Sequence, residues 1–477
     1  MGARSELEVL LATAAAEPSV SPDALFAQAA AFDRLGRDES AQAAYLQVLK
    51  LAPDHVECLT ALGRLLLRSG RRTAAKTALG RVLALRPGSP AAHVNLALAV
   101  SADDLDAARA HYLEALKLDP QHREASQGLA ILLLRAGEVD RARARARIGG
   151  LGQALPSPYR GQGRAISLLL LQAAAGGNVA IDRFIDDRVF ARHTLATEFY
   201  DPALPLPPHD LVFNAIGDAD LCGEALDRAA LVVAATAAPV LNPPARVRAT
   251  GRAANAESLG RLPGVTTARM REWPRAVLTD PAAEHVLAEA GFRFPLLLRA
   301  PGFHTGEHFA KVDTPAELRP ALDQLPGATV LVLEFLAIQS PDAHFRKYRV
   351  MVVGPSLYPL HLAVSQHWKV HLFTAAQDER CLAEDRAFLR DMPGVLGERA
   401  LASLGSIVRE LGLDYGGVDF ALDANGNVAV FEANATMIVP PPSEDPRLRY
   451  RIQPVTRIEQ AVRRLLADAA RQTASLA

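Results

Sequence analysis

The N-terminal third of the chain repeats with a period of about 34 residues, and this constrains the fold more than any other feature. Three segments end alike at Pro53, Pro87 and Pro120, which are spaced 34 and 33 residues apart. A small residue lies twelve positions before each proline, and a bulky one lies eight positions before it. These residues are Ala41, Ala75 and Ala108, and Tyr45, Leu79 and Tyr112. Because proline stops a helix and small residues let helices approach closely, the pattern predicts stacked helix pairs.

The pattern resembles the tetratricopeptide repeat family over about residues 22–148, with a degenerate fourth unit over residues 122–147. The third unit is one residue short, near Ser101–Asp104. The resemblance implies a concave helical surface that binds a peptide or protein segment, so we expect an all-α domain over residues 1–150 with such a partner. A self-associating array and an unrelated helical bundle are the alternatives.

Bulk composition excludes several other classes of protein. The 477 residues suffice for about three domains, and the net charge of −1 gives no electrostatic reason to bind nucleic acid or a membrane. No run of about 18 uncharged apolar residues occurs in the sequence, so we expect no membrane span. The apolar run near the N-terminus is short and interrupted by Glu8, so we expect a helix there and no signal peptide. Three distant cysteines favour a reduced, cytoplasmic protein without disulfides: Cys58, Cys222 and Cys381.

The periodic pattern stops after Gly149. Residues 151–162 are rich in Gly, Pro and polar side chains, and we expect a linker there. Apolar runs then alternate with helical segments over residues 163–243, which indicates a small α/β layer. Three polar residues at the end of one predicted strand either face a substrate or are solvated: Asn214, Asp218 and Asp220.

Residues 418–436, VDFALDANGNVAVFEANAT, contain two alternating apolar runs around Asn425–Gly426. Asn-Gly is the strongest short hairpin signal and favours a two-residue loop, which would place Ala424 opposite Asn427. In this register, two acidic residues further along the strands are directly paired.

The paired acids are Asp419 and Glu432, with Asn434 on the same face of the sheet. Like charges at directly paired positions are destabilising, so the pair needs a cation between them or a bound proton. Two carboxylates and an amide oxygen form a ligand set that suits Mg²⁺ shared with substrate phosphates, with Mn²⁺ as an alternative. The other interpretation is an ordinary hairpin with solvated acids, as we expect for Asp423 near the turn.

Two segments upstream of the hairpin offer nucleotide contacts. The loop 301–307 would supply backbone N–H groups to a phosphate, although a plain hairpin turn fits equally well. Its small residues are Gly302, Thr305 and Gly306. Residues 330–338 read as a buried strand with Glu334 in its middle, where the carboxylate either forms an ion pair or belongs to an adenine-binding hinge.

Residues 345–373 read as two or three strands with basic residues at their ends: Lys347, Arg349, Lys369 and His371. Arg349 is expected to open an apolar strand, and Lys369 follows a tryptophan. Two cations on adjacent strands suit a phosphate or an acyl phosphate. The alternative is that each one extends into solvent from a strand end.

The order strand, glycine loop, hinge, arginine strand and acidic hairpin resembles the ATP-grasp superfamily over about residues 163–466. Within it, the likeness is to glutathione synthetase and to ligases that add glutamate to ribosomal protein. The resemblance implies a multidomain chain, in which helical repeats precede an α/β pre-ATP-grasp substrate domain (163–243) and an α+β ATP-grasp catalytic domain (244–470). It also implies ATP and Mg²⁺ as cofactors.

The resemblance assigns roles to individual residues. The magnesium ligands of the family are matched by Asp419, Glu432 and Asn434. The cover over the triphosphate is matched by Gly302, Thr305 and Gly306. The adenine-binding hinge is matched by Glu334, Phe335 and Leu336. The basic residues beside the acyl phosphate are matched by Arg349 and Lys369.

The chain departs from the family pattern at two places. Arg252 and Arg299 lie where relatives carry lysines that hold phosphates, and it is open whether these arginines replace them, since arginine also grips phosphate. His371 lies where relatives carry an asparagine, and the glycines that follow in relatives are missing. The pocket for the second substrate is therefore expected to differ.

The resemblance implies an ATP-dependent ligase that joins a carboxylate to an amine through an acyl phosphate. The repeat domain would hold a peptide or protein while the catalytic part modifies it with a small amine or carboxylate. One alternative is a non-catalytic peptide-binding scaffold with a relic nucleotide-binding fold. Another is phosphoryl transfer without ligation.

Overall fold

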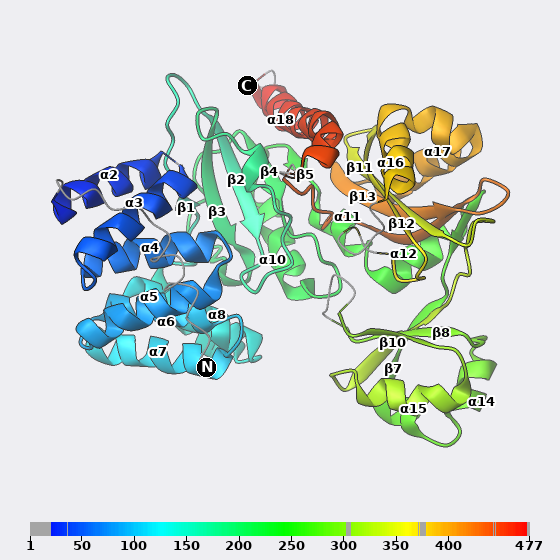
Figure 1. The fold of residues 1–477 in the computed structure, drawn as a ribbon, viewed down its shortest axis with the longest axis horizontal. Helices are drawn as coiled ribbons and strands as arrows, with labels where there is room; N and C mark the ends of the chain where they lie inside the picture. The colour runs from blue at the N-terminus through cyan, green and yellow to red at the C-terminus, as the bar shows by residue number, and fades with distance from the viewer. Residues whose placement is uncertain are drawn as a thin grey trace. The chain divides into compact units, whose positions relative to one another are not determined.

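A computed structural model describes residues 21–35, 37–301, 307–370, 372, 378–441, 443 and 445–474. The chain divides into two compact units, Met1–Gly152 and Gln153–Ala477 (Figure 1). Among the described residues, no helix is long and apolar enough to cross a membrane. The helix expected around Glu8 lies outside these residues.

The first unit is built from consecutive pairs of helices. Its described residues form eight helices: α2 (Pro22–Arg34), α3 (Asp38–Leu51), α4 (Val56–Arg68), α5 (Arg72–Leu85), α6 (Pro90–Val100), α7 (Leu105–Leu118), α8 (Arg123–Arg135) and α9 (Val139–Gly149). The small repeat residues Ala41, Ala75 and Ala108 are fully buried, which confirms their expected place between closely packed helices. The bulky repeat positions are buried as well: Tyr45, Leu79 and Tyr112.

Local signals set the ends of these helices. The hydroxyl groups of Ser21 and Ser89 accept hydrogen bonds from backbone N–H groups in the first turns of α2 and α6. Helices α3, α5 and α7 end at Leu51, Leu85 and Leu118, two residues before the three repeat prolines. The prolines therefore stop the second helix of each repeat, as the sequence pattern predicts.

The second unit begins with a five-stranded sheet, here the first sheet, in the order β1-β3-β2-β4-β5. Its elements are β1 (Leu155–Pro156), β2 (Ile166–Gln172), η1 (Asp182–Phe184), β3 (Phe190–Ala196), η2 (Thr197–Phe199), β4 (Leu211–Asn214), α10 (Gly223–Ala234) and β5 (Val240–Leu241). All neighbouring strands are parallel except β1 and β3. We expected a linker over residues 151–162, but Leu155–Pro156 form the edge strand β1 and pair with β3. Pro156 is compatible with this strand because proline is tolerated at the edge of a sheet.

A small lobe follows, built on a four-stranded antiparallel sheet, here the lobe sheet, in the order β7-β10-β8-β9. Its elements are β7 (Met270–Pro274), α13 (Arg275–Thr279), α14 (Ala283–Glu289), β8 (Leu296–Arg299), β9 (Phe309–Val312), α15 (Pro315–Asp323) and β10 (Thr329–Glu334). Leu296 and Leu298 pack with the helices in a hydrophobic core of the lobe's own. Leu297 and Arg299 alternate with them and therefore face the other side.

The main sheet contains five strands in the order β12-β11-β13-β14-β6, all antiparallel except β14 and β6. Its strands are β6 (Val265–Thr267), β11 (Phe345–Val353), β12 (Ser356–Ser365), β13 (Tyr415–Leu422) and β14 (Val428–Asn434). The associated helices are α11 (Pro244–Arg248), α12 (Arg252–Leu259), α16 (Glu379–Arg390), α17 (Met392–Leu411), η3 (Pro446–Arg451) and α18 (Ile452–Ala474).

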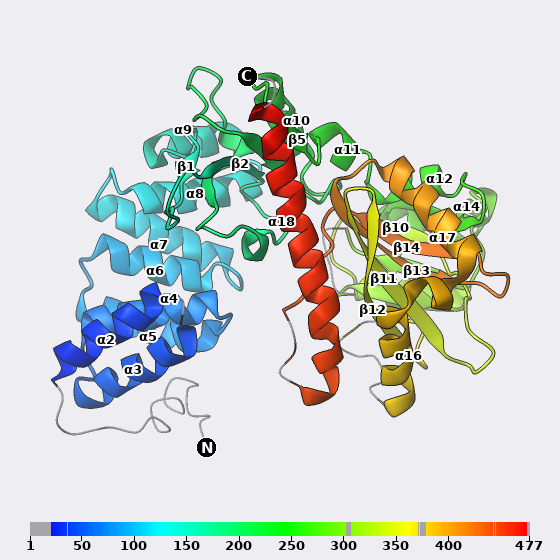
Figure 2. The same cartoon turned by 90° about the horizontal axis from the view of Figure 1, so that it is seen from above.

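One hydrophobic core joins the first sheet to the main sheet. It contains Leu169 and Phe213 from the first sheet and Val350 and Phe420 from the main sheet. Helix α18 packs against β4 as well as β11 and β12, and Figure 2 shows its length beside the main sheet. The main sheet is therefore held on a rigid base, while the lobe has a separate core.

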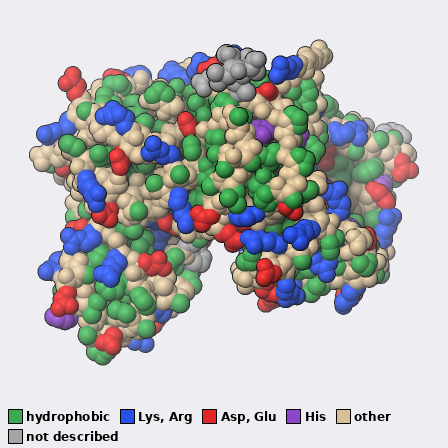
Figure 3. Space-filling model, turned by 180° about the vertical axis from the view of Figure 1, so that it is seen from behind, with side chains coloured by type: hydrophobic (Ala, Val, Ile, Leu, Met, Phe, Trp, Pro, Cys, Tyr) green, Lys and Arg blue, Asp and Glu red, His purple; other side chains and the backbone are tan. Residues whose placement is uncertain are grey.

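Charged side chains of both signs are scattered over one face of the molecule (Figure 3). On the face drawn in Figure 3, Lys and Arg lie interspersed with Asp and Glu. This distribution agrees with the net charge of −1.

Candidate active-site cavity

A cavity of about 370 Å³ lies between the lobe sheet and the main sheet. The lobe sheet contributes Leu297, Arg299 and Leu333, whose positions alternate with residues of the lobe core. Most of the other lining residues are apolar, among them Met270, Phe309, Phe335, Leu336, Trp368, Val370, Phe431, Met437 and Ile438. The main sheet supplies most of the charged wall.

A row of charged side chains crosses the cavity face of the main sheet. Arg349 on β11 pairs directly with Asp419 on β13, and Asp419 pairs directly with Glu432 on β14. Directly paired residues share a face of the sheet, and all three line the cavity. Arg349 does not open its strand as expected, because the polar residues before it also join the ladder and β11 begins at Phe345.

Asp419 is 2% exposed, and two cations of β11 compensate its charge. Its carboxylate accepts hydrogen bonds from Nε and Nη2 of Arg349 at 2.5 and 2.7 Å, and Nζ of Lys347 lies 3.0 Å away. Burial alone would raise the pKa of this carboxyl, but Arg349 and Lys347 hold the pKa below its ordinary range. The facing acids therefore coexist without requiring a metal ion or a proton between them.

The hairpin loop is longer than the sequence predicts. The N–H of Gly426 donates to the carbonyl of Asp423, and the N–H of Asp423 donates to the carbonyl of Asn427, which encloses three residues. The prediction of a two-residue loop with Ala424 opposite Asn427 is therefore wrong. Gly426 adopts a φ of +75°, the left-handed conformation that three-residue hairpin loops need at this position. The carboxylate of Asp423 accepts bonds within the turn instead of being merely solvated.

A β-bulge restores the acid pair. Phe420 pairs with Val430, but Asp419 pairs with Glu432, so Phe431 has no partner in the ladder. The one-residue shift compensates the longer loop, and the predicted pairing of Asp419 with Glu432 is confirmed. Because of the bulge, the consecutive residues Val430, Phe431 and Glu432 all line the cavity. Phe431 is 43% exposed.

Glu432 and Asn434 lie at the acidic end of the row. Nδ2 of Asn434 donates to Oε1 of Glu432 at 3.0 Å, and Oδ1 of Asn434 accepts from the backbone N–H and hydroxyl of Thr436. Nη2 of Arg252, at the start of α12, lies 3.6 Å from Oε1 of Glu432, and its Nη1 donates to Asp220 at 2.9 Å. Asp220 is therefore an orienting partner of Arg252.

The other two polar residues at and beyond the end of β4 have structural partners. Nδ2 of the buried Asn214 donates to the carbonyl of Asn242 at 2.9 Å. Oδ1 of Asp218 accepts from the N–H groups of Asp220 and Leu221, each at 2.9 Å. Both residues shape the loop that presents Asp220 to Arg252.

The hinge residues line the cavity, but Glu334 does not lie inside a buried strand as expected. Strand β10 ends at Glu334, because neither neighbouring strand offers a pairing partner beyond it. The side chain is exposed, and its Oε2 accepts from the N–H of Arg269 at 3.3 Å. Phe335 and Leu336 follow on the cavity wall, where the ring of Phe335 packs edge-on against Trp368.

Arg299 and Lys369 bring further positive charge to the cavity. Arg299 ends β8, and burial followed by the nearby Arg252 lowers its pKa. Lys369 lies four residues beyond the end of β12. The remaining predicted basic and glycine-loop residues lie outside the described residues: His371, Gly302, Thr305 and Gly306.

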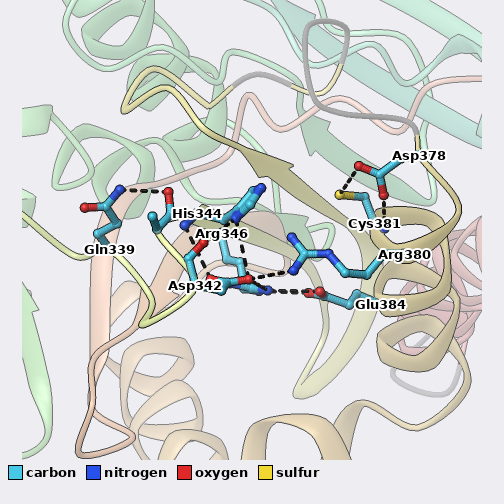
Figure 4. Close-up of polar contacts among 9 residues, drawn as sticks. Gln339, Asp342, His344, Arg346, Asp378, Arg380, Cys381 and Glu384 are labelled. Atoms are coloured by element: carbon cyan, nitrogen blue, oxygen red, sulfur yellow. Dashed lines mark hydrogen bonds and ion pairs between the residues drawn. The ribbon is translucent and has the colours of Figure 1, made fainter.

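Arg346 fastens the segment that follows the hinge (Figure 4). Its guanidinium binds both oxygens of Asp342 at 2.9 Å and both oxygens of Glu384 at 2.8 and 2.9 Å. Arg380 donates to Asp342 at 3.0 Å as well. Such bidentate pairs fix geometry, so the chain between Phe335 and β11 is tied to α16. The sequence prediction missed Arg346, although an acid four residues before it was a usable signal.

His361 is another cavity residue that the sequence prediction missed. It pairs with Arg349 across β11 and β12, is 3% exposed and lines the cavity. A single histidine within an apolar strand was its only sequence signal. Among the described residues, no cluster of three or more His, Cys, Asp or Glu side chains suited to a metal ion is present.

A family model for the tetratricopeptide repeat matches residues 34–98 and 99–148. These residues carry tetratricopeptide repeats. The match agrees with the paired helices α2–α9 and with the period of the sequence. The comparison with curated proteins gives no match.

Several solved structures are similar to parts of the chain. The MamA protein of Desulfovibrio magneticus RS-1 is 27% identical with a TM-score of 0.24, covering 27% of this chain and 71% of that one. A thermophilic tetratricopeptide protein of Thermus thermophilus is 20% identical with a TM-score of 0.26, covering 27% and 73%. The VanG D-Ala:D-Ser ligase of Enterococcus faecalis is 14% identical with a TM-score of 0.40, covering 64% and 100%.

Proposed function

We propose that Gln153–Ala477 is an ATP- and Mg²⁺-dependent ligase of the ATP-grasp type that joins a carboxylate to an amine. The observation that carries the proposal is the cavity between the two sheets, which combines an apolar wall with a row of charges. A nucleotide has the same two halves, a base with apolar faces and an anionic triphosphate. The base would lie against Phe335, Leu336 and Phe431, and the phosphates would point toward Arg349.

Several cations surround the charged half of the cavity. Lys347, Arg299 and Lys369 line it, and Arg252 lies beside Glu432. The guanidinium fork matches phosphate oxygens in a bidentate manner, so arginine can take the place of a phosphate-binding lysine. Arg252 and Arg299 would therefore bind the phosphates that relatives hold with lysines.

The acidic end of the row fits a Mg²⁺ ion. Asp419, Glu432 and Asn434 offer oxygen ligands, and Mg²⁺ in nucleotide sites takes one or two carboxylates together with substrate phosphates. The side chain of Glu432 is 29% exposed, and its Oε2 has no hydrogen bond to a described residue, so it is accessible to a ligand. When bound, the ion would offset phosphate charge, and Mn²⁺ would serve in the same way.

The residues of the chain would then position two transfers. Arg349 and Lys369 would hold the γ-phosphate beside a substrate carboxylate, whose oxygen attacks phosphorus and displaces ADP. An amine then attacks the acyl carbon, the C–N bond forms, the C–O bond breaks, and the amine proton leaves with the phosphate. In both steps the protein contributes orientation and charge neutralisation.

The repeat unit supports a peptide or protein as one of the two substrates. Tetratricopeptide repeats form surfaces that bind peptide segments, and those of this chain belong to the same polypeptide as the cavity. Tethering a bound segment raises its effective concentration at a linked site. The other substrate would be a small amine or carboxylate.

Glu432→Gln is the sharpest test of the proposal. The change removes one ligand charge at a partly exposed position, so it should lower Mg²⁺-dependent ATP turnover about 100-fold while leaving the fold intact. Asp423→Asn is the matched control, since it alters an acid of the same hairpin that faces the turn, and it should keep turnover within about twofold. Unchanged turnover in Glu432→Gln would sink the assignment.

A non-catalytic scaffold is the second candidate, and one observation favours it. Lys347 and Arg349 already neutralise Asp419, so the acid pair is stable without a metal ion. Calorimetry with ATP and Mg²⁺ decides between the two, because a scaffold with a relic fold would bind neither. Phosphate released only when acid and amine are both present would rule out phosphoryl transfer without ligation.

A further inference from the structure

The polar row of the main sheet extends one strand beyond Arg349. His361 on β12 is the residue paired directly with Arg349, so both side chains belong to the same face of the sheet. His361 is 3% exposed and lines the cavity. Its neighbours Leu360 and Leu362 are buried and apolar. A buried imidazole side chain is unusual in a strand whose neighbouring residues are buried and apolar.

The side chain of His361 forms no hydrogen bond to any described residue, and its buried Nδ1 has no partner. A buried polar group without a partner is unfavourable, so such a group needs an explanation. Burial, and then the positive charge of Arg349, lower the pKa of His361 well below its ordinary value. The ring is therefore a neutral imidazole, which carries one N–H donor and one acceptor nitrogen.

Arg349, the residue paired with His361, has an unused donor. Its Nε and Nη2 bind Asp419, whereas its Nη1 makes no hydrogen bond to a described residue. A neutral imidazole donor and a guanidinium donor on adjacent strands suit an oxyanion. The carboxylate of Asp419, on the neighbouring strand β13, occupies Nε and Nη2 of Arg349. An anionic ligand would therefore approach the guanidinium from the side of β12, which carries His361.

We propose that His361 and Nη1 of Arg349 together bind an oxygen of the phosphoryl group that is transferred. The assignment rests on the proposed ligase function, and it adds a phosphate-contacting residue that lies outside the acidic hairpin and the hinge. Through this contact the neutral histidine would help to hold the phosphate while leaving the charge balance of the row unchanged.

The test is binding of inorganic phosphate to the full chain in the presence of saturating ADP and Mg²⁺, measured by calorimetry. His361→Phe keeps a ring of similar size and removes both nitrogens. Phosphate affinity should fall about tenfold in this variant, while ADP affinity stays within about twofold. The urea midpoint should stay equal or rise, because the buried atom without a partner is gone.

His193→Phe is the matched control. His193 lies on β3 of the first sheet, away from the cavity lining, and its Nδ1 is also buried without a partner. It should gain stability in the same way and keep wild-type phosphate affinity. If His361→Phe does not fold, His361→Leu serves instead, since it also lacks both nitrogens and should lower phosphate affinity about tenfold.

The outcomes separate the two proposals. Wild-type phosphate affinity in His361→Phe, or no phosphate binding by the wild type in the presence of ADP and Mg²⁺, would overturn the role of His361. If the wild type binds no ADP, the ligase proposal fails. In that case phosphate is titrated alone. Phosphate binding that depends on His361 would still support the proposed contact between His361, Arg349 and a phosphate oxygen. Phosphate binding that does not depend on His361 would overturn that contact.

Discussion

At the residue scale, Asp419 forms ion pairs with two cations at the centre of the charged cavity wall. Its side chain is 3% exposed between Lys347 and Arg349. Asp419→Asn would leave these two half-buried cations without a counter-charge, and breaking a buried pair on one side costs about 3–5 kcal/mol. Urea unfolding of the full chain at neutral pH measures this loss. A loss below about 1 kcal/mol would show that water screens the pair.

The same pair gives a pH dependence whose sign follows from the lowered pKa of Asp419. A carboxyl with a lowered folded pKa stabilises the protein fully above its unfolded value of about 4, and loses that effect as the pH falls through the folded pKa. The difference between the wild type and Asp419→Asn should therefore be largest near neutral pH and shrink below about pH 4. Unfolding midpoints across this range test the expectation, and a difference that grows in acid would contradict it.

The residue scale also shows where sequence reasoning reached its limit. Pairing Asp419 with Glu432 was predictable because side chains alternate strictly along a hairpin. The loop length and the bulge at Phe431 were both missed, and the two errors cancelled. The cations on Asp419 were missed too, because the neighbour of β13 is β11, and local sequence does not specify which distant strands pair.

At the element scale, close approach of repeat helices depends on single glycines. A Cβ added to Gly63 on α4 would lie 2.6 Å from Cγ of Leu79 on α5, which is fully buried. We expect Gly63→Ala to destabilise the repeat unit by about 1–2 kcal/mol, because overpacking outweighs the gain in helix propensity. Far-UV circular dichroism during urea unfolding reports the loss of helix.

Gly80 provides the control for this prediction. It follows Leu79 on the same helix, and a Cβ added there would have nothing within 4 Å. Gly80→Ala should therefore raise stability by up to about 1 kcal/mol through helix propensity alone. Equal effects of the two substitutions would mean that the contact with Leu79 relaxes freely.

Elements with a strong local signal were predictable, and those defined by distant partners were not. The repeat prolines gave the ends of α3, α5 and α7, since a proline interrupts a helix wherever it falls. Strand β1 was missed because Leu155–Pro156 becomes a strand only by pairing with β3. The end of β10 at Glu334 was missed for the same reason, as its neighbours set its length.

At the scale of the whole molecule, cores rather than sequence boundaries define what unfolds together. The sequence predicts a domain boundary at residues 243 and 244, yet residues on both sides of it share one core. The lobe sheet has a core of its own, although it lies within the predicted catalytic domain. The residue pattern of a segment indicates whether it forms helices or strands. Whether two segments share one hydrophobic core depends on tertiary packing, which the sequence pattern does not specify.

Three buried thiols can report on these cores separately. Cys58 belongs to a core of the repeat unit, and Cys222 and Cys381 belong to the core that joins the first sheet to the main sheet. Burial raises the pKa of Cys58 and of Cys222 to about 12, and it also raises the pKa of Cys381. At about pH 8 the native protein should therefore react slowly with a disulfide reagent, because the thiolate is the reactive form.

Labelling in increasing urea, read by peptide mass spectrometry, should modify Cys222 and Cys381 together, because one cooperative core shields both. Cys58 should be modified at its own urea concentration, since its core belongs to the other compact unit. Labelling in fully denaturing urea, where all three thiols react, provides the control. If Cys222 reacted at lower urea than Cys381, the first sheet and the main sheet would unfold independently, and the charged wall of the cavity would lack the rigid base inferred for it.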